Sequence, residues 1–219
     1  MRHLAVAVAL TFATGAEAQV LDQGTLVIKQ GGKEIGREEF VIRSGRTGGA
    51  QGTTLVTRGR FPAVAPALSQ EATAERKGDG SFANIQVTRE QGAAVSRFIA
   101  EVTPRNVLRI HASSSAGSEE GREYPGVPRL IGLVDSSYAL FVAVVPLATP
   151  AGATITAVYP EDGSRVTFTA RRVDGGDGDS VSSIVMSGEI SGTIWLDASD
   201  RILRLEFPSV GLEAVRLRR

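Results

Sequence analysis

The stretch 130–147, LIGLVDSSYALFVAVVPL, is the longest apolar run that follows the N-terminal segment, and Asp135 is its only charged residue. Eighteen residues lie at the lower limit for crossing a bilayer. Asp135, Ser136, Ser137 and Pro146 also interrupt the run, so we expect no transmembrane span here. Elsewhere the sequence shows short alternating patterns, and we therefore expect the other segments to fold around this one.

Two local structures fit the stretch 130–147. Asp135 followed by two serines is typical of a helix N-cap, and from Tyr138 onward Phe141, Val144 and Val145 recur at helical spacing. Other apolar residues fill the remaining faces, which is typical of a buried helix that Pro146 would end. A buried strand stays open as the alternative, because several of these residues are β-branched valines. We expect a buried helix in the concave face of a sheet.

The N-terminal residues 1–18 have the pattern of a secretory signal peptide. Arg2 and His3 give a positive start, 4–13 is apolar, and the sequence Ala-Glu-Ala at 16–18 fits a small-x-small cleavage site. We expect cleavage after Ala18 and an exported chain, periplasmic or secreted, that is soluble and has no transmembrane span.

Composition limits the remaining possibilities for 19–219, which we expect to form a single antiparallel β domain. The chain has no cysteine, so packing rather than disulfides must stabilise it. Its 24 basic and 24 acidic residues balance, which argues against nucleic acid as a partner. The 25 glycines favour turns and strands.

Alternating patterns bounded by glycine and proline predict a mainly β fold with one antiparallel curved sheet of about 10–13 strands. The sheet would be a half-barrel or a nearly closed barrel. The clearest case is 164–173, where Val166, Phe168 and Ala170 alternate with polar residues. The expected strands are 24–30, 34–43, 53–61, 67–77, 81–90, 93–102, 106–113, 153–159, 164–173, 182–190, 192–197, 201–207 and 211–217. We expect loops at 44–51 and at 114–128, where a polar segment carries Glu119, Glu120, Arg122 and Glu123.

Residues capable of catalysis or metal binding are sparse. Beyond the leader, His111 is the only histidine, so we expect neither a histidine-dependent triad nor a zinc site. The loop 174–179, DGGDGD, has aspartates at 174, 177 and 179 but lacks the closing glutamate of an EF-hand, and calcium binding there stays open. Asp135, Glu189, Asp197 and Glu206 are carboxylates at strand ends or bends, and their spacing selects no catalytic pair. We assign no catalytic residue, metal or cofactor.

The C-terminal strands carry the most recognisable pattern. Gly192-Thr193-Ile194-Trp195-Leu196-Asp197 precedes alternating leucine and arginine at 201–206, then Phe207, Pro208 and Gly211. Together with Gly36-x-Glu38-x-Phe40 near the N-terminus, this pattern resembles exported bacterial proteins of a family of unknown function. The resemblance implies an antiparallel sheet related in shape to the half-barrels of periplasmic lipoprotein carriers, and it implies no catalytic residues.

Three functions remain open. The first is a non-catalytic envelope protein that binds an apolar or lipid-like ligand. The second is a structural or protein-interaction module whose sheet edge or charged loop contacts another envelope protein. The third is a hydrolase with an unrecognised carboxylate pair. For the first function we expect the residues that line the site of the apolar ligand to be Tyr138, Phe141, Val145, Trp195 and Phe207. The sequence does not identify a ligand, a partner or an oligomeric state.

Overall fold

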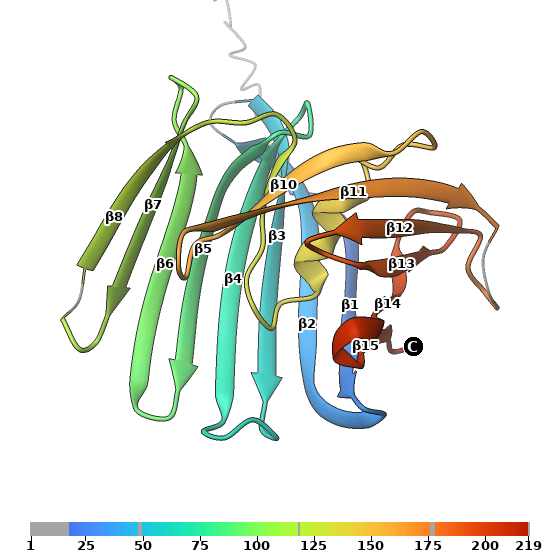
Figure 1. The fold of residues 1–219 in the computed structure, drawn as a ribbon, viewed down its shortest axis with the longest axis horizontal. Coiled ribbons are helices and arrows are strands. Elements are labelled where there is room, and N and C mark those ends of the chain that lie inside the picture. Colours follow the sequence, from blue (N-terminus) through green and yellow to red (C-terminus); the bar gives the residue numbers. More distant parts are fainter. Residues whose placement is uncertain (1–17, 48–49, 118, 176–177, 219) are drawn as a thin grey trace, which may run out of the picture.

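The computed structural model describes residues 18–47, 50–117, 119–175 and 178–218. The expected signal peptide therefore lies almost entirely outside the described residues. Among the described residues, fifteen strands form one sheet in the order β8-β7-β6-β5-β4-β3-β2-β1-β15-β14-β13-β12-β11-β10-β9 (Figure 1). The strands in chain order are β1 (Val20–Gln30), β2 (Lys33–Thr47), β3 (Ala50–Phe61), β4 (Leu68–Lys77), β5 (Phe82–Gln91), β6 (Ala94–Val102), β7 (Val107–Ser114), β8 (Glu119–Pro125), β9 (Leu130–Gly132), β10 (Ala153–Tyr159), β11 (Ser164–Asp174), β12 (Ser182–Gly188), β13 (Gly192–Leu196), β14 (Ile202–Phe207) and β15 (Leu212–Arg216).

The sheet consists of two antiparallel meanders joined at β1. One meander runs from β1 to β8, the other from β10 to β15, and β15 returns to pair with β1 through Leu26 and Arg216. Glycines allow the tightest turns: Gly31 and Gly32 have φ angles of 55° and 79° between β1 and β2. Among the strands of the described residues, the short β9 pairs in parallel with β10, and an isolated parallel bridge joins Thr149 to Arg171. The prediction of a mainly β, largely antiparallel sheet is therefore confirmed.

The sheet curls so that its second half passes over the inner face of the first (Figure 1). β9 packs against β5, and Gly132 permits this approach because a Cβ atom there would lie 2.8 Å from the Phe82 ring and 2.9 Å from Ile85. The order of hydrogen-bonded strands ends at β8 and β9, so the sheet is open rather than closed. Side chains nevertheless connect β8 to the turn between β10 and β11: Arg122 donates to the carbonyl of Asp162, and the Arg165 guanidinium lies 4.5 Å from the centre of the Tyr124 ring.

The buried segment is not the helix predicted for 130–147. It begins with β9 and contains only the 3₁₀ helix η1 (Ala139–Val144). The predicted cap at Asp135 is also wrong, because its backbone N–H donates to Glu161 and Ser136 has a φ angle of 66°. Helical geometry cannot start there, so η1 is confined to the few residues before Pro146. A second 3₁₀ helix, η2 (Pro208–Val210), precedes β15.

The expected loops and strand number also need correction. Fifteen strands are found where about 10–13 were expected, because β8 and β9 were not predicted. β8 lies inside the stretch 114–128, which was expected to be a loop. It is an edge strand whose residues are nearly all exposed, so no face needs alternating apolar residues and its charges are tolerated. Likewise, β2 extends to Thr47 and β3 starts at Ala50, within the expected loop 44–51.

The core lies on the concave side, between the long strands and the segment that contains η1. Five of the six residues of η1 are buried. Opposite them, Leu26, Ile28, Ile85 and Phe168 are almost completely buried on the inner face of the sheet. Neither helix among the described residues has the length and apolar character required to cross a bilayer.

Candidate functional site

The turn that leads into η1 is held by a buried carboxylate from the opposite side of the core. Glu38, on the inner face of β2, is inaccessible to solvent. Its Oε2 atom accepts hydrogen bonds from the backbone N–H groups of Tyr138 at 2.7 Å and Ala139 at 2.9 Å. Its Oε1 atom accepts one from the Ser137 hydroxyl at 2.6 Å. Glu38 thus satisfies N–H groups that the short helix cannot satisfy itself.

Two opposing effects act on the Glu38 carboxyl group. Burial raises its pKa, because a charge without water is costly. The hydrogen bonds from Ser137, Ala139 and Tyr138 lower the pKa, since they favour the ionised form. Burial is the larger effect, so the pKa of Glu38 lies above its ordinary value.

A second polar network holds Asp135, three residues before Tyr138. Its carbonyl accepts hydrogen bonds from Gln70 Nε2 at 3.0 Å and Arg89 Nη2 at 3.1 Å, and its N–H donates to Glu161 at 2.8 Å. Arg89 and Glu161 form an ion pair at 3.0 Å. Burial raises the pKa of Glu161, although Arg89 and the N–H of Asp135 oppose that shift. The network joins β4, β5 and the β10–β11 turn to the buried segment.

A partly open pocket of about 260 Å³, called the interior pocket below, lies beside this anchored segment. Residues from β2, β3, β4, β5 and β9 line it on the side of the sheet. The segment of η1 and the residues that follow it, together with Asp200 of the β13–β14 turn, complete the lining. Most of the lining is apolar, including Ile42, Leu55, Phe82, Leu140, Val142 and Val145. The polar anchors Glu38, Gln70, Arg89 and Glu161 do not line the pocket, which presents hydrocarbon rather than hydrogen-bonding groups over most of its surface.

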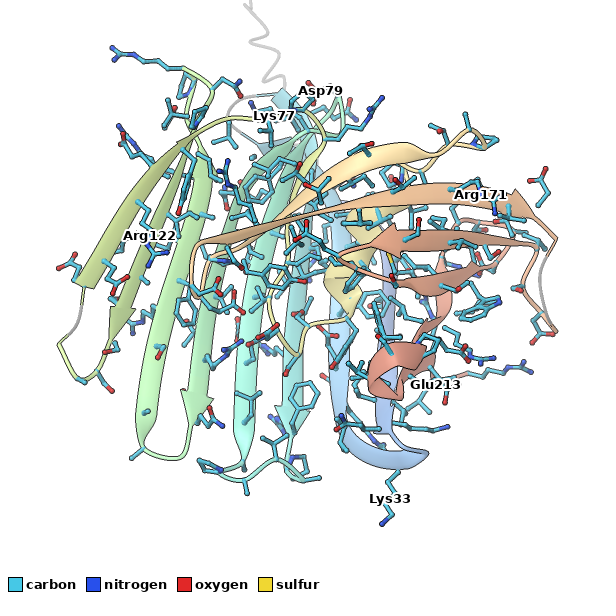
Figure 2. All side chains as sticks on the ribbon, viewed as in Figure 1. Lys33, Lys77, Asp79, Arg122, Arg171 and Glu213 are labelled. Atoms are coloured by element: carbon cyan, nitrogen blue, oxygen red, sulfur yellow. The ribbon has the colours of Figure 1, made fainter. Side chains whose placement is uncertain are left out.

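Two charged residues, Arg76 and Asp200, line the same pocket. Arg76 is near the end of β4, and its Nε and Nη2 atoms donate to the carbonyl of Gly80 at 3.0 and 2.6 Å. Asp200 belongs to the β13–β14 turn and accepts a hydrogen bond from Arg172 at 2.6 Å. Figure 2 shows this end of the long strands: Lys77, the last residue of β4, and Asp79, in the β4–β5 turn, lie at the end opposite to Lys33. The pocket is therefore apolar with one polar side.

The five residues predicted to line a ligand are separated by the structure. Of these, only Val145 lines the interior pocket. Phe141 and Tyr138 pack on Phe207, with ring centres 5.1 and 6.3 Å apart, and form an aromatic cluster between η1 and β14. Burial, followed by the charges of Glu38 and Asp135, raises the pKa of Tyr138. The aromatic cluster is part of the packing that holds η1 in place.

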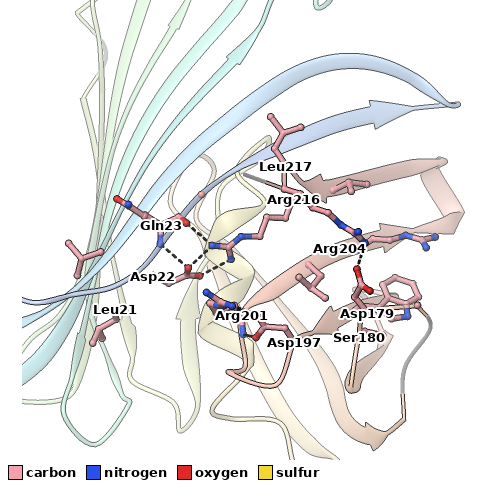
Figure 3. Close-up of a pocket in the computed structure, with 17 residues that line it drawn as sticks. Leu21, Asp22, Gln23, Asp179, Ser180, Asp197, Arg201, Arg204, Arg216 and Leu217 are labelled. Atoms are coloured by element: carbon pink, nitrogen blue, oxygen red, sulfur yellow. Dashed lines mark hydrogen bonds and ion pairs between the residues drawn. The ribbon is translucent and has the colours of Figure 1, made fainter.

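Trp195 faces away from the buried Ile194 and Leu196 and lies on a different surface. The Arg204 guanidinium lies 4.6 Å from the centre of its ring. Both residues line a wide, half-open depression of about 780 Å³ near the start of β1 and the end of β15 (Figure 3). Four arginines line this depression, and each is paired with a carboxylate. It is larger than the interior pocket, but its charges are already neutralised by neighbouring side chains.

The most buried pair in this depression joins Asp22 to Arg216. Two nitrogens of Arg216 contact both carboxylate oxygens of Asp22, at 2.5 and 2.9 Å, and Arg216 also donates to the carbonyl of Gln23 (Figure 3). The guanidinium lies 5.3 Å from the centre of the Phe40 ring. A second pair, Arg201 with Asp197, lies in the same view and is more exposed. The Asp22–Arg216 pair connects the first strand to the last, whereas Arg201 and Asp197 pair within the β13–β14 turn.

The residues considered for catalysis or metal binding are dispersed. His111 lies on β7 and contacts Glu119 at 3.2 Å. Glu189 accepts a hydrogen bond from the N–H of Thr167, whereas Asp197 and Glu206 pair with arginines. In the loop 174–179, Asp177 lies outside the described residues and Asp179 pairs with Arg218. No cluster of three or more potential metal ligands occurs among the described residues.

Sequence reasoning missed the four residues that organise this region: Glu38, Arg76, Arg89 and Glu161. One signal was available. Glu38 alternates with Phe40 and Ile42, so the strand pattern itself places a carboxylate on the buried face of β2. The other three could not be found this way, because their partners come from distant parts of the chain.

Comparison with known proteins supports the fold. No family model matches the sequence, and no curated protein matches it at a significant level. Among solved structures, the fold is similar to that of a β-barrel-like protein from Brucella abortus, which belongs to the domain of unknown function DUF1849. The two structures have a TM-score of 0.51 and 10% sequence identity, and the match covers 90% of this chain and 95% of the other chain. A DUF1089 family protein from Pseudomonas aeruginosa is less similar, with a TM-score of 0.41 and 11% identity. That match covers 95% of this chain and 98% of the other chain, and we draw no conclusion from it.

The chain therefore has the fold of a barrel-like β protein. The expected resemblance to barrel-like proteins of unknown function is confirmed at the level of the fold. At 10% identity the likeness extends no further than the fold.

Proposed function

We propose that this protein is a non-catalytic binding protein for a small apolar ligand, held in the interior pocket between η1 and the sheet. The observation that carries the proposal is the apolar lining of this pocket, which has one polar side formed by Arg76 and Asp200. Binding sites for small molecules commonly combine an apolar wall with a few placed polar groups. Glu38 and Gln70 are residue types that act in catalysis in other proteins. Here they form hydrogen bonds that hold in place the segment that forms the pocket wall.

The size of the pocket limits the ligand. Its volume of about 260 Å³ is slightly below the usual range of about 300–1,000 Å³ for small-molecule sites. If a methylene group takes roughly the 30 Å³ share of a liquid water molecule, the pocket holds roughly eight such groups. A single medium-length chain fits this volume, and a two-chain lipid exceeds it.

The leader pattern at 1–18 supports an envelope or secreted location as part of the same proposal. Native mass spectrometry of the protein purified from its own cells should then reveal a co-purified small ligand. Titration calorimetry with 1-octanol provides a direct test with a neutral, defined chain. If octanol does not bind and no small molecule co-purifies, the binding function is wrong.

Matched substitutions make the location of the ligand testable. Ala74→Phe places a ring in the pocket from β4 and should reduce octanol affinity at least tenfold, with little loss of stability if the space is free. Ala94→Phe makes the same chemical change at an exposed position of β6 that does not line the pocket, and should leave affinity unchanged. Equal effects of both substitutions would place the ligand elsewhere.

A second candidate function is strand-mediated binding of another envelope protein, and β8 is the observation that favours it. β8 lies at one end of the sheet order and pairs only with β7 among the described strands. An edge strand exposes unpaired backbone groups that can accept another strand. A photoreactive residue placed at the exposed Glu120 should then cross-link a discrete partner in intact cells. The same photoreactive residue at the exposed Glu71 of β4, away from the edge strand, should capture no partner.

A further inference from the structure

Arg76 differs from two other partly buried arginines, Arg89 and Arg216, in the way its charge is balanced. Arg89 pairs with Glu161 at 3.0 Å, and Arg216 pairs with Asp22 at 2.5 Å. In the part of the chain that the structure describes, no carboxylate lies within ion-pair distance of Arg76. The guanidinium of Arg76 instead uses two nitrogens to hold the carbonyl of Gly80, which fixes its position on the pocket wall.

The surroundings of Arg76 disfavour an uncompensated charge. Arg76 is half-buried, and burial lowers its pKa even though the charge of nearby Asp79 acts in the opposite direction. The Asp79 carboxylate is exposed and accepts a hydrogen bond from the N–H of Ser81. Asp200, the acidic residue of the pocket, is engaged by Arg172. A cation in this setting gains free energy when an anion enters beside it.

We infer that Arg76 binds the carboxylate of a single-chain fatty acid of medium length, whose hydrocarbon chain occupies the apolar part of the interior pocket. This inference rests on the proposed binding function and adds the chemical class of the ligand. A planar guanidinium matches a carboxylate in shape and charge. The Asp200 carboxylate at the same pocket repels a doubly charged phosphate more strongly than a singly charged carboxylate, which favours the carboxylate.

The test compares three ligands with the same chain and different head groups: octanoate, 1-octanol and octylammonium. Calorimetry at neutral pH should show that the wild-type protein binds octanoate at least tenfold more tightly than octanol, and octylammonium least tightly. Arg76→Gln should remove the preference for octanoate, so that the ratio of the octanol to the octanoate dissociation constant falls at least tenfold. Arg76→Lys keeps the charge and should retain a reduced preference. Arg58→Gln removes an exposed arginine on the other face of the sheet and should change nothing.

The possible results distinguish a failure of the inference about Arg76 from a failure of the proposed binding function. If the wild-type protein binds octanol as tightly as octanoate, Arg76 does not select the head group and the inference is wrong, whereas the binding function stands. The inference also fails if Arg76→Gln weakens both ligands equally, because Arg76 would then only shape the β4–β5 turn. Failure of all three ligands to bind would overturn the proposed function itself.

Discussion

The Glu38 carboxylate accepts hydrogen bonds from the backbone N–H groups of Tyr138 and Ala139, one hundred residues later in the chain. A helix usually receives such a bond from a residue at its own start. Here the acceptor comes from the middle of β2, on the far wall of the core. The interaction determines where η1 begins and therefore which of its side chains line the pocket.

Replacing Glu38 should destabilise the protein strongly. Glu38→Ala leaves two backbone N–H groups and the Ser137 hydroxyl without their acceptor in a buried site. Since each buried unsatisfied donor costs about 1–3 kcal/mol, the free energy of unfolding should fall by about 2–4 kcal/mol in urea melts. Glu39→Ala, at the exposed neighbouring position, should stay within about 0.5 kcal/mol of the wild type. Similar losses for both variants would contradict the capping role.

The stability contributed by Glu38 should decrease as pH rises. Its pKa in the folded protein lies above the ordinary value of 4.5, so the folded state binds a proton more tightly than the unfolded state does. The contribution is fully present below about pH 4.5 and is lost as pH rises through the raised pKa. The difference in unfolding free energy between the wild type and Glu38→Gln, followed by urea melts across this range, should therefore decline with pH. A difference that grows with pH would show that the hydrogen bonds outweigh burial.

Phe141 and Val145 should separate packing from ligand binding. Phe141 is buried against Phe207 and does not line the pocket, so Phe141→Ala should cost about 3–5 kcal/mol of stability. Val145→Ala enlarges the pocket and should cost about 1–2 kcal/mol. The Val145→Ala variant should prefer a longer ligand, so the ratio of its affinity for 1-decanol to its affinity for 1-octanol should exceed that of the wild type. An unchanged ratio would argue that Val145 does not touch the chain.

The two ion pairs of the outer depression should differ in their contribution to stability. Arg216→Gln leaves the largely buried Asp22 carboxylate without its partner, so stability should fall by about 3–5 kcal/mol. Arg201→Gln breaks a more exposed pair with Asp197 and should cost no more than about 1 kcal/mol. Thermal melts of both variants in parallel provide the comparison. A small effect at Arg216 would indicate that the strand ends are held together by other contacts.

The N-terminus of the exported protein offers a test of the location. The small-x-small pattern at 16–18 predicts cleavage after Ala18. N-terminal sequencing of protein collected from the cell envelope should begin at Gln19. Protein that retains Met1 would contradict export through this leader.

Several parts of the fold could be predicted from local sequence because the signal is local. Alternation such as Val166, Phe168 and Ala170 predicts a strand with one buried face, and the structure has β11 there. β8 escaped prediction for the opposite reason: an exposed edge strand needs no alternation. Helical spacing after Tyr138 predicted a buried helix, but the structure has only the 3₁₀ helix η1 there, because Asp135 is held by contacts with distant parts of the chain.

The sequence by itself determined the class of fold, because hydrophobic alternation and turn glycines act between neighbours along the chain. It also determined that 130–147 would avoid water, since so long an apolar run must be covered. Only the tertiary structure decided what surrounds that segment. Strand pairings between residues far apart in sequence bury Glu38 beneath η1 and bring Arg76 and Asp200 to the same pocket. Those pairings depend on how the whole sheet curls, and no local pattern specifies that curvature.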